Sequence, residues 1–448
     1  MTVPTTAPAP ALPPIPDPAS RALPALAAVI GVDWATDQHD VALQALDAPG
    51  GAATGAVEEC RVRHTPEALA AWLATLERRF GGQPIGVAIE TSRGPVVHAL
   101  LDAPFIVLYP VNPRSLRRFR ETFSPNGAKD DAPDARLLLR LLVHHRDQLR
   151  SWRAEDAPTR LLQRLVEQRR AAVDLRTQLT LQLQAVLKEY FPQALTWAGD
   201  DLTSPLASAF LTRWPTLAVL QRARPATVHP FFTRHGCRRQ ERIAARLEEI
   251  QAARPLTRDA AVITSGELAV QLLVGQLTAL RPSLAKLDAT IAAHFAAHAD
   301  APLFASFPGA GAALAPRLLV ALGTDRARFP SAADVQTHTG IAPITVRSGR
   351  QQQVHWRWAT STFLRQTFHE FAHHSIRHTA WAHAFYAQQR RRGKTHHAAV
   401  RTLAFKWIRI IWRCWHDRQP YDNARYERAL QLHHSPLSEL LAIDVDAA

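Results

Sequence analysis

Short apolar runs that end in an acidic residue recur in the first third of the chain. Residues 27–33 (AAVIGVD) and 85–90 (IGVAIE) are too short for a typical helix and close on a carboxylate, which is typical of buried strands. Residues 66–80 instead repeat Leu69, Leu73 and Leu76 at helical spacing. The hydrophobic pattern therefore predicts that strands and helices alternate here, with residues 27–33 as a central strand.

The order of the predicted elements indicates a fold class. Three strands precede a helix–strand–helix–strand–helix succession, which is the order of an α/β domain. The expected strands are residues 27–33, 40–46, 57–63, 85–90 and 105–109, and the expected helices are 66–80, 95–101, 112–119 and one that begins at Asp131.

Residues 155–300 show apolar positions at alternating spacings of four and three, the pattern of a coiled-coil seam. Pro282 is expected to kink or restart the second helix of this region. Two arrangements remain open: an arm that pairs subunits, or an antiparallel hairpin within one chain. The predicted seams are Leu161, Leu165, Gln168, Ala172, Leu175, Leu179, Gln182 and Val186, then Leu273, Leu277, Leu280, Leu284, Leu287 and Ile291.

The C-terminal third contains two glycine-rich turns. Residues 307–311 (FPGAG), followed by the apolar segment 313–322, resemble a helix–hairpin–helix turn, although an ordinary glycine-capped junction gives the same string. Ser348 lies between Arg347 and a Gly-Arg pair, where a hydroxyl can be exposed beside groups that bind anions. A simple turn residue is the alternative for Ser348.

Composition points to a polyanionic partner. The chain of 448 residues carries 53 Lys and Arg against 39 Asp and Glu, a formal net charge of +14. Only five of these basic residues are lysines, and arginine offers a planar fork for phosphates. Codon bias in a GC-rich genome is the alternative source of the arginines. The charge favours nucleic acid over a membrane surface as the partner.

Targeting signals were not found. No run reaches the roughly 18 uninterrupted apolar residues that span a bilayer. Residues 1–26 are rich in Pro and Ala without a basic start, so we interpret them as a disordered leader and not a signal peptide. We therefore expect a cytoplasmic, nucleoid-associated protein with no membrane partner.

A basic tract with interleaved aromatic residues occupies residues 386–418. Such a tract suits neutralisation of a nucleic-acid backbone and stacking on bases, whereas core packing is expected for Phe405, Ile408 and Trp412 at helical spacing. The histidine pairs at 373–374 and 396–397 lack a Cys or carboxylate to complete a zinc site, so no zinc is expected. The candidate nucleic-acid contacts are Arg114, Arg117, Arg118, Arg347, Arg350, Arg390, Arg391, Arg392 and Lys394.

Four acidic residues stand at the ends of core elements. Asp33 and Glu90 close two predicted strands, and Asp131 and Asp134 share one side of the first turn of a helix. Acids at neighbouring strand ends converge on one edge of a sheet, and such a cluster requires a cation. Mg²⁺ or Mn²⁺ is the natural occupant, although each acid alone is also explained as a helix cap or a solvated strand end.

These motifs together resemble the DEDD transposases of insertion sequences, now understood as bridge-RNA-guided recombinases. The family joins a RuvC-like domain to a C-terminal domain with a catalytic serine, and the resemblance covers residues 27–150 and 300–418. It places the family's acids on Asp33, Glu90, Asp131 and Asp134, and its nucleophile on Ser348. The last two acids lie in a stretch similar to Lys-Thr-Asp-x-x-Asp-Ala, and the serine in one similar to Gly-Leu-x-Pro…Ser-Gly.

The chain departs from the family pattern at three positions. Asp130 stands where Thr is usual, which leaves open whether Asp130 or Asp131 is the ligand. Ile341 replaces a Leu, and Trp358 lies where a small Gly is expected. None of these changes removes a proposed catalytic group.

The resemblance implies an RNase H/RuvC-like α/β domain, a mainly α coiled-coil region and a mainly α serine domain. The implied domains are a leader at 1–26, the DEDD domain at 27–150, the helical region at 151–300, the serine domain at 301–420 and a tail at 421–448. It further implies strand exchange through a phosphoserine at Ser348, assisted by Mg²⁺ or Mn²⁺, with Arg347 and Arg350 stabilising charge.

The partners implied are donor and target DNA, a structured guide RNA and further copies of the chain in a dimer or tetramer. Two other functions compete with this one. A metal-dependent RuvC-like nuclease or junction resolvase would use the acids alone, with Ser348 as a turn residue. A non-catalytic nucleic-acid-binding protein would use neither.

Overall fold

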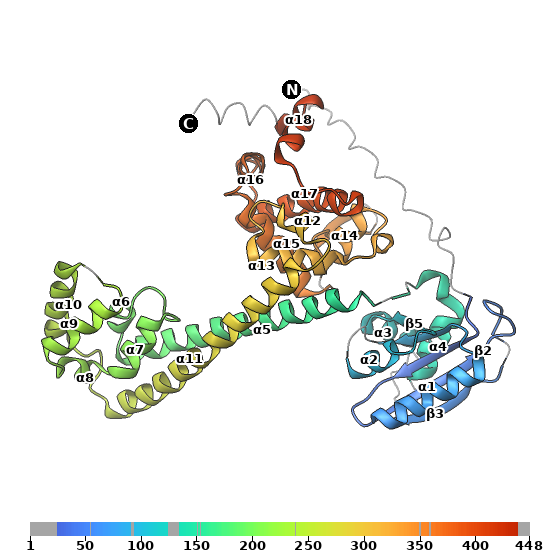
Figure 1. Ribbon diagram of the computed structural model, residues 1–448, viewed down its shortest axis with the longest axis horizontal. Coiled ribbons are helices and arrows are strands. Elements are labelled where there is room, and N and C mark those ends of the chain that lie inside the picture. Colours follow the sequence, from blue (N-terminus) through green and yellow to red (C-terminus); the bar gives the residue numbers. More distant parts are fainter. Residues whose placement is uncertain are drawn as a thin grey trace. The chain divides into compact units, whose positions relative to one another are not determined.

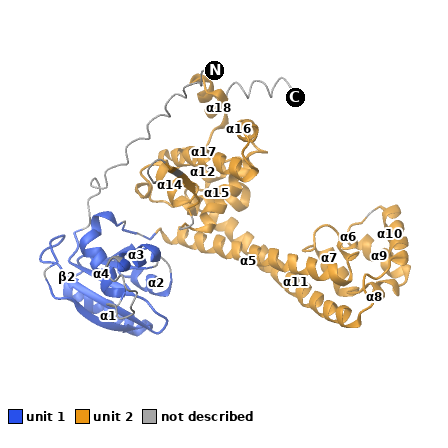
Figure 2. Ribbon diagram, turned by 180° about the vertical axis from the view of Figure 1, so that it is seen from behind, with its two compact units in different colours: residues 1–154 blue, residues 155–448 orange. Residues whose placement is uncertain are grey.

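The computed structural model describes residues 25–53, 55–90, 94–123, 134–149, 151–152, 154–237, 239–348, 351–357 and 360–437, with the backbone alone for Ser348 and Gln352. The chain divides into two compact units, residues 1–154 and 155–448 (Figure 2). Residues 1–24 of the expected leader and 438–448 of the expected tail lie outside the described residues.

Unit 1 is built on a five-stranded sheet in the order β3-β2-β1-β4-β5 (Figure 1). β1 is antiparallel to β2 and parallel to β4, and β5 continues the parallel side. The α/β order and the central position of the first strand are therefore confirmed. The strands are β1 Ala28–Asp33, β2 Gln38–Ala45, β3 Glu58–Arg63, β4 Ile85–Ile89 and β5 Ile106–Pro110.

Helices cover both faces of this sheet. Alternate residues of each strand point to opposite faces, and two separate apolar cores result. One core lies under α1 and α2, and the other lies under α3 and α4. The helices are α1 Pro66–Phe80, α2 Pro95–Leu101, α3 Pro113–Phe123 and α4 Asp134–His145, followed by the 3₁₀ turn η2 Arg146–Gln148.

Unit 2 contains two long helices that lie side by side, α5 and α11 (Figure 1). Five shorter helices connect them and form an apolar core with their paired ends. The intramolecular hairpin is therefore the arrangement that the chain adopts. The helices are α5 Ala157–Tyr190, α6 Ala194–Trp197, α7 Pro205–Arg213, α8 Leu217–Gln221, α9 Pro225–Arg234, α10 Gln240–Ala252 and α11 Ala260–Ala296.

The predicted seam is confirmed for one helix of the hairpin and only in part for the other. On α11 the burial of Leu273, Leu277 and Leu284 confirms the prediction, and the helix continues through Pro282. On α5 Leu179 is buried as predicted, but the other buried leucines are displaced by one residue from predicted positions: Leu162 is fully buried whereas Leu161 is 41% exposed. The heptad spacing was present on both helices, but the face that meets a partner depends on how the two helices pack.

α11 is also the one helix among the described residues that is long and apolar enough to cross a membrane. Its apolar composition has another explanation in the fold, because Val270, Leu273 and Val274 are buried in the core shared with α5 and the five short helices. These side chains need an apolar environment and obtain it within the chain.

The rest of unit 2 is a mainly helical domain around a large apolar core. Trp381, Trp407 and Trp415 are fully buried in it, so Trp407 and Trp415 do not offer faces for base stacking. Ile408 is buried as predicted, but Phe405 is 38% exposed and its prediction was wrong. The elements are α12 Ala301–Ala305, α13 Gly311–Leu322, η3 Arg326–Arg328, α14 Ala332–His338, β6 Ile344–Ser348, β7 Gln351–His355, α15 Thr362–Ser375, α16 Ala380–Arg391, α17 His396–Asp417 and α18 Asn423–Leu432.

The glycine-rich turn before α13 packs inside this domain. Gly309 has a φ of +79°, and a Cβ on it would lie 2.8 Å from the His378 ring and 3.2 Å from the carbonyl carbon of His374. Gly309 is therefore needed for close contact with the end of α15.

Candidate active site

Two predicted acids lie at the same end of neighbouring strands. Asp33 is the last residue of β1, and Glu90 directly follows β4. The two strands are parallel, with Val32 opposite Ile89, so the residues that come next are adjacent at the edge of the sheet. The prediction that strand order would bring these two acids together agrees with the structure.

The third acid arrives from a helix because of a glycine. Asp134 is the first residue of α4, which crosses β1 on the sheet face shared by Asp33 and Gly31. A Cβ on Gly31 would lie 2.5 Å from the backbone nitrogen of Leu139 and would collide with the carbonyl oxygen of Ala135. Only glycine permits this approach, and the approach carries Asp134 toward the end of β1.

The three carboxylates interact electrostatically. Burial, followed by the charges of Asp134, Glu90 and Asp40, raises the pKa of Asp33 to about 6. Burial and then the charge of Asp134 raise the pKa of Glu90, while Arg120 lowers it. Asp134 and Glu90 thus destabilise the ionised form of Asp33, and a cation placed among these carboxylates would relieve the repulsion.

Two further charged residues of the site were missed by sequence analysis. Arg120 of α3 forms an ion pair with Asp134 and is the cation that opposes the repulsion at Asp33. Asp40 of β2 lies directly opposite Asp33 in the antiparallel register and receives a 3.0 Å hydrogen bond from Arg61. The spacing within any one element does not reveal these neighbours, although a correct β1–β2 hairpin register would have identified Asp40.

The donor set fits a hard divalent cation. Among the described residues no three potential ligand side chains are gathered into a ready metal site. Nevertheless, three carboxylates that repel one another at a half-buried sheet edge supply the oxygen ligands that Mg²⁺ and Mn²⁺ prefer. Asp131 and its competitor Asp130 lie outside the described residues, so the choice between them remains a prediction.

The candidate nucleophile lies at the end of a two-stranded hairpin in unit 2. Ser348 is the last residue of β6 and pairs with Gln351 of β7. Arg347, opposite Gln352, is exposed, whereas Arg350 and Trp358 lie outside the described residues. The hairpin carries Ser348 next to its turn, and this position is compatible with both a nucleophile and a turn residue.

The basic candidates in unit 1 lie on α3. Arg114 and Arg118 are exposed, and Arg117 is exposed but donates to Glu121 at 3.1 Å. Leu116, by contrast, is buried against the sheet. The helix therefore presents a basic outer surface, as the sequence indicated, with part of its charge already paired.

Four further basic candidates in unit 2 lie at the end of α16 and just beyond it. Arg390, Arg391 and Arg392 are exposed, and Arg390 donates to the carbonyl oxygen of Lys394 at 2.9 Å. Lys394 is half-buried, and its ammonium donates to Thr402 Oγ1 at 3.1 Å. The three arginines are the better placed for an external polyanion.

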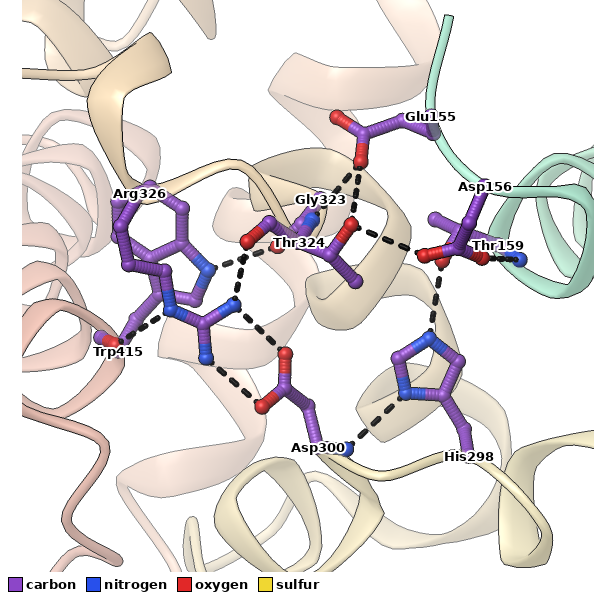
Figure 3. Close-up of polar contacts among 9 residues, drawn as sticks. All are labelled: Glu155, Asp156, Thr159, His298, Asp300, Gly323, Thr324, Arg326 and Trp415. Atoms are coloured by element: carbon purple, nitrogen blue, oxygen red, sulfur yellow. Dashed lines mark hydrogen bonds and ion pairs between the residues drawn. The ribbon is translucent and has the colours of Figure 1, made fainter.

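A partly buried polar network fixes the start of unit 2 to its C-terminal domain (Figure 3). Glu155 accepts hydrogen bonds from the backbone nitrogen and hydroxyl of Thr324, both at 2.9 Å, and from Arg328 at 3.0 Å. Asp156 caps α5 by accepting from the backbone nitrogen of Thr159 at 2.8 Å. The first residues after unit 1 are therefore firmly anchored.

The same network joins the start of α12 to α17. Arg326 donates to both carboxylate oxygens of Asp300 at 2.7 Å and to the carbonyl oxygen of Trp415 at 3.0 Å (Figure 3). Trp415 in turn donates to the carbonyl oxygen of Gly323 at 2.7 Å. These partners are far apart in sequence, which is why no local pattern indicated them, and we assign them a structural role.

An acid cluster at the edge of a mixed sheet, where two parallel strands end, in one chain with an arginine-rich helical domain, indicates an enzyme that acts on nucleic acid. Comparison with known protein families identifies the class of enzyme. Residues 30–192 match the family model of the DEDD domain of IS110 elements, described as transposase. Residues 301–387 match the model described as transposase of the IS116/IS110/IS902 family.

Individual relatives agree. The chain is 32% identical over 419 residues to a Streptomyces coelicolor protein assigned as the mini-circle transposase for IS117, a match covering 88% of this chain and 95% of the relative. It is 28% identical over 376 residues to the 42 kDa protein of insertion element IS900 from Mycobacterium paratuberculosis, covering 81% and 91%. The chain belongs to the IS110/IS116/IS902 family of insertion-sequence transposases.

Proposed function

We propose that this transposase exchanges DNA strands through a transient phosphoserine at Ser348, with Asp33, Glu90, Asp131 and Asp134 holding a divalent metal ion. The observation that carries the proposal is the electrostatic coupling of Asp33, Glu90 and Asp134, three acids that come from separate segments of unit 1. Acidic residues that served only as unrelated strand ends or helix caps would have no reason to converge on one edge of the sheet.

The chemistry assigns a distinct part to each residue. The Oγ of Ser348 attacks a phosphodiester phosphorus, so an O–P bond to serine forms while the bond to one deoxyribose oxygen breaks. The serine hydroxyl loses a proton and the departing oxygen gains one. Attack of a partner strand's hydroxyl on the phosphoserine reverses the step and releases the serine. Bound Mg²⁺ or Mn²⁺ would supply neutralisation of phosphate charge.

The basic residues take the supporting positions. Arg347 and Arg350, on either side of Ser348, would stabilise charge on the phosphorus undergoing transfer. Arg114, Arg117, Arg118, Arg390, Arg391, Arg392 and Lys394 would contact the nucleic-acid backbone. Target choice would come from base pairing with a structured guide RNA, as the family resemblance implies, and the acids and the serine would meet on one phosphate within a dimer or tetramer.

Trapping of a covalent adduct tests the proposal. Wild-type protein, co-expressed with its RNA and given nicked or junction DNA with Mg²⁺, is expected to form an SDS-resistant protein–DNA adduct. Ser348→Ala should abolish the adduct, and Asp33→Asn should weaken it at least about a hundredfold. Thr345→Ala, on the same strand, and Asp37→Asn, in the exposed turn after β1, are matched controls that should retain it.

The outcomes separate the competing functions. Cleavage that survives Ser348→Ala without any adduct would exclude the recombinase and leave the metal-dependent nuclease. DNA binding that is unchanged in every variant, with no cleavage by the wild type, would favour a non-catalytic binding protein.

A further inference from the structure

Four histidines from two helices meet on one face of the C-terminal domain. His369 and His373 are one turn apart on α15, and His396 and His397 begin α17, which packs beside it. His397 Nδ1 lies 3.4 Å from His369 Nε2, and the ring centroids of His373 and His396 are 5.3 Å apart. His373 and the pair 396–397, which the sequence singled out separately, thus form one cluster together with His369.

Two arginines extend this cluster along the same helix faces. Arg365 lies one turn before His369, and Arg401 lies one turn after His397. Their guanidinium carbons lie 5.1 Å and 3.5 Å from the ring centroid of Trp356, which directly follows β7 of the Ser348 hairpin. We name Arg365, His369, His373, His396, His397 and Arg401 the histidine–arginine face.

Among the described residues, no acidic side chain forms a hydrogen bond or ion pair with the histidine–arginine face. Glu370 is the one acidic residue between positions 362 and 416, and it engages Arg170 at 2.8 Å and Arg317 at 2.5 Å. His373 and His397 are exposed and open this part of the face to solvent, whereas the two arginines are half-buried against Trp356. A solvent-accessible group of donors without a carboxylate is suited to an external anion.

The charges on the face repel one another in the isolated chain. Burial, followed by His397, Arg401, His396 and His373, lowers the pKa of His369 to about 4. Burial also lowers the pKa of His373, with His396, His374 and Arg377 as the next causes. Burial and then Arg365 lower the pKa of Arg401.

An anion bound among these groups would reverse these effects. A phosphate favours the protonated imidazoles, so its binding would be coupled to proton uptake.

A metal ion is a poorer occupant than phosphate. Among the described residues no group of three or more potential ligands has the arrangement of a metal site. His396 Nδ1 is already within 2.8 Å of the Tyr386 hydroxyl, and the guanidinium of Arg401 would repel a cation. Because Trp356 connects the histidine–arginine face to the Ser348 hairpin, the anion expected there is the DNA strand on which Ser348 acts.

We propose that the histidine–arginine face binds the phosphodiester backbone of the DNA strand cleaved by Ser348, and that His369 and His373 take up protons as the phosphates bind. This inference rests on the proposed function and adds the surface that would hold the DNA strand beside Ser348. It predicts a DNA affinity that rises on acidification through these two histidines in particular.

Fluorescence anisotropy with a labelled single-stranded DNA of mixed sequence tests the coupling at constant salt. From about pH 7.5 to about pH 5.5 the wild-type Kd is expected to fall about tenfold, because each proton taken up contributes up to tenfold per pH unit. In the double variant His369→Gln/His373→Gln, the Kd should fall only about twofold over the same pH range. His294→Gln/His433→Gln, with two exposed histidines outside the face, is the matched control and should behave as wild type.

A second readout locates the contact. Diethyl pyrocarbonate modifies neutral imidazoles, and DNA should protect His373 and His397 while leaving His294 and His433 reactive, as measured by peptide mass spectrometry. Should the double variant unfold, Arg401→Gln supplies the test, with an expected loss of affinity of about fivefold at neutral pH.

Several results would overturn the inference. The first is an equal change of DNA affinity with pH in the double variant and its control, and the second is a failure of DNA to protect His373 and His397 from modification. The third is an affinity that depends on pH for RNA of the same sequence but not for DNA. The fourth is one bound zinc ion per chain that is lost in His373→Gln. A failure of the proposed function looks different: the wild type would form no serine adduct at any pH, whereas an adduct with pH-independent DNA binding would refute the histidine–arginine face alone.

Discussion

Gly31 of β1 lies directly beneath Ala135 of α4, with no space for a side chain between the strand and the helix. Gly31→Ala should therefore displace α4 and destabilise unit 1 by about 2–4 kcal/mol, because the obstructing atoms are backbone and cannot rotate away. Thermal unfolding would measure the loss. Gly275→Ala is the matched control: a Cβ there meets nothing within 4 Å in mid-helix, so stability should be unchanged or rise by up to about 1 kcal/mol.

Asp33 makes unit 1 sensitive to pH in the absence of metal. Its pKa of about 6 in the folded protein exceeds its ordinary value of 3.8, mainly through burial. The protonated form is thus favoured by folding, and this stabilisation is fully present below about pH 4 and lost as the pH rises through about 6. Asp33→Asn should be more stable than wild type at pH 7, by about 1–2 kcal/mol after allowance for solvent, and equal to it near pH 4.

Measurement in EDTA isolates this effect from metal binding. Asp37→Asn, in an exposed turn, should follow the wild type at every pH. A constant difference between Asp33→Asn and wild type across this range would show that the carboxyl does not titrate as stated.

Mn²⁺ should raise the unfolding temperature of the wild type at pH 7 by several degrees, because a ligand that binds only the folded state stabilises it. Asp33→Asn and Asp134→Asn should lose most of this shift, and the shift should decline below about pH 6, where protons compete for Asp33. Differential scanning fluorimetry with and without Mn²⁺ provides the measurement. An undiminished shift in both variants would place the metal elsewhere.

Glu370 joins two arginines that come from different helices. It pairs with Arg317 of α13, whose side chain is 8% exposed, and with Arg170 of α5. Glu370→Ala should cost about 3–5 kcal/mol, because it leaves the buried guanidinium of Arg317 without its counterion. Asp288→Ala, which removes the partner of Arg169 at a more exposed position, should cost less than about 1 kcal/mol in the same denaturation experiment.

The α5 seam can be verified with two neighbouring leucines. Leu183 is fully buried in the hairpin core, whereas Leu181 is 60% exposed. Leu183→Ala should destabilise unit 2 by about 2–5 kcal/mol, and Leu181→Ala by less than about 0.5 kcal/mol. Urea denaturation distinguishes them, and similar costs for both would contradict the observed seam.

Local pattern was sufficient for the elements and for much of the acid cluster. The strands that end at Asp33 and Ile89 were predictable because a short apolar run bounded by polar residues has few other solutions. Their parallel pairing then placed Asp33 beside Glu90. On α11 the spacing of Leu273 and Leu277 was enough to predict which face of the helix is buried.

Tertiary structure decided which faces and charges meet. The α5 seam, the pairing of Arg120 with Asp134 and the meeting of His369 with His397 join segments that no periodicity relates. The sequence by itself determined local conformation and the supply of chemical groups, because these depend on neighbours within a few residues. The partners of each group were decided by packing, because contact free energies between distant segments exist only once the chain has closed on itself.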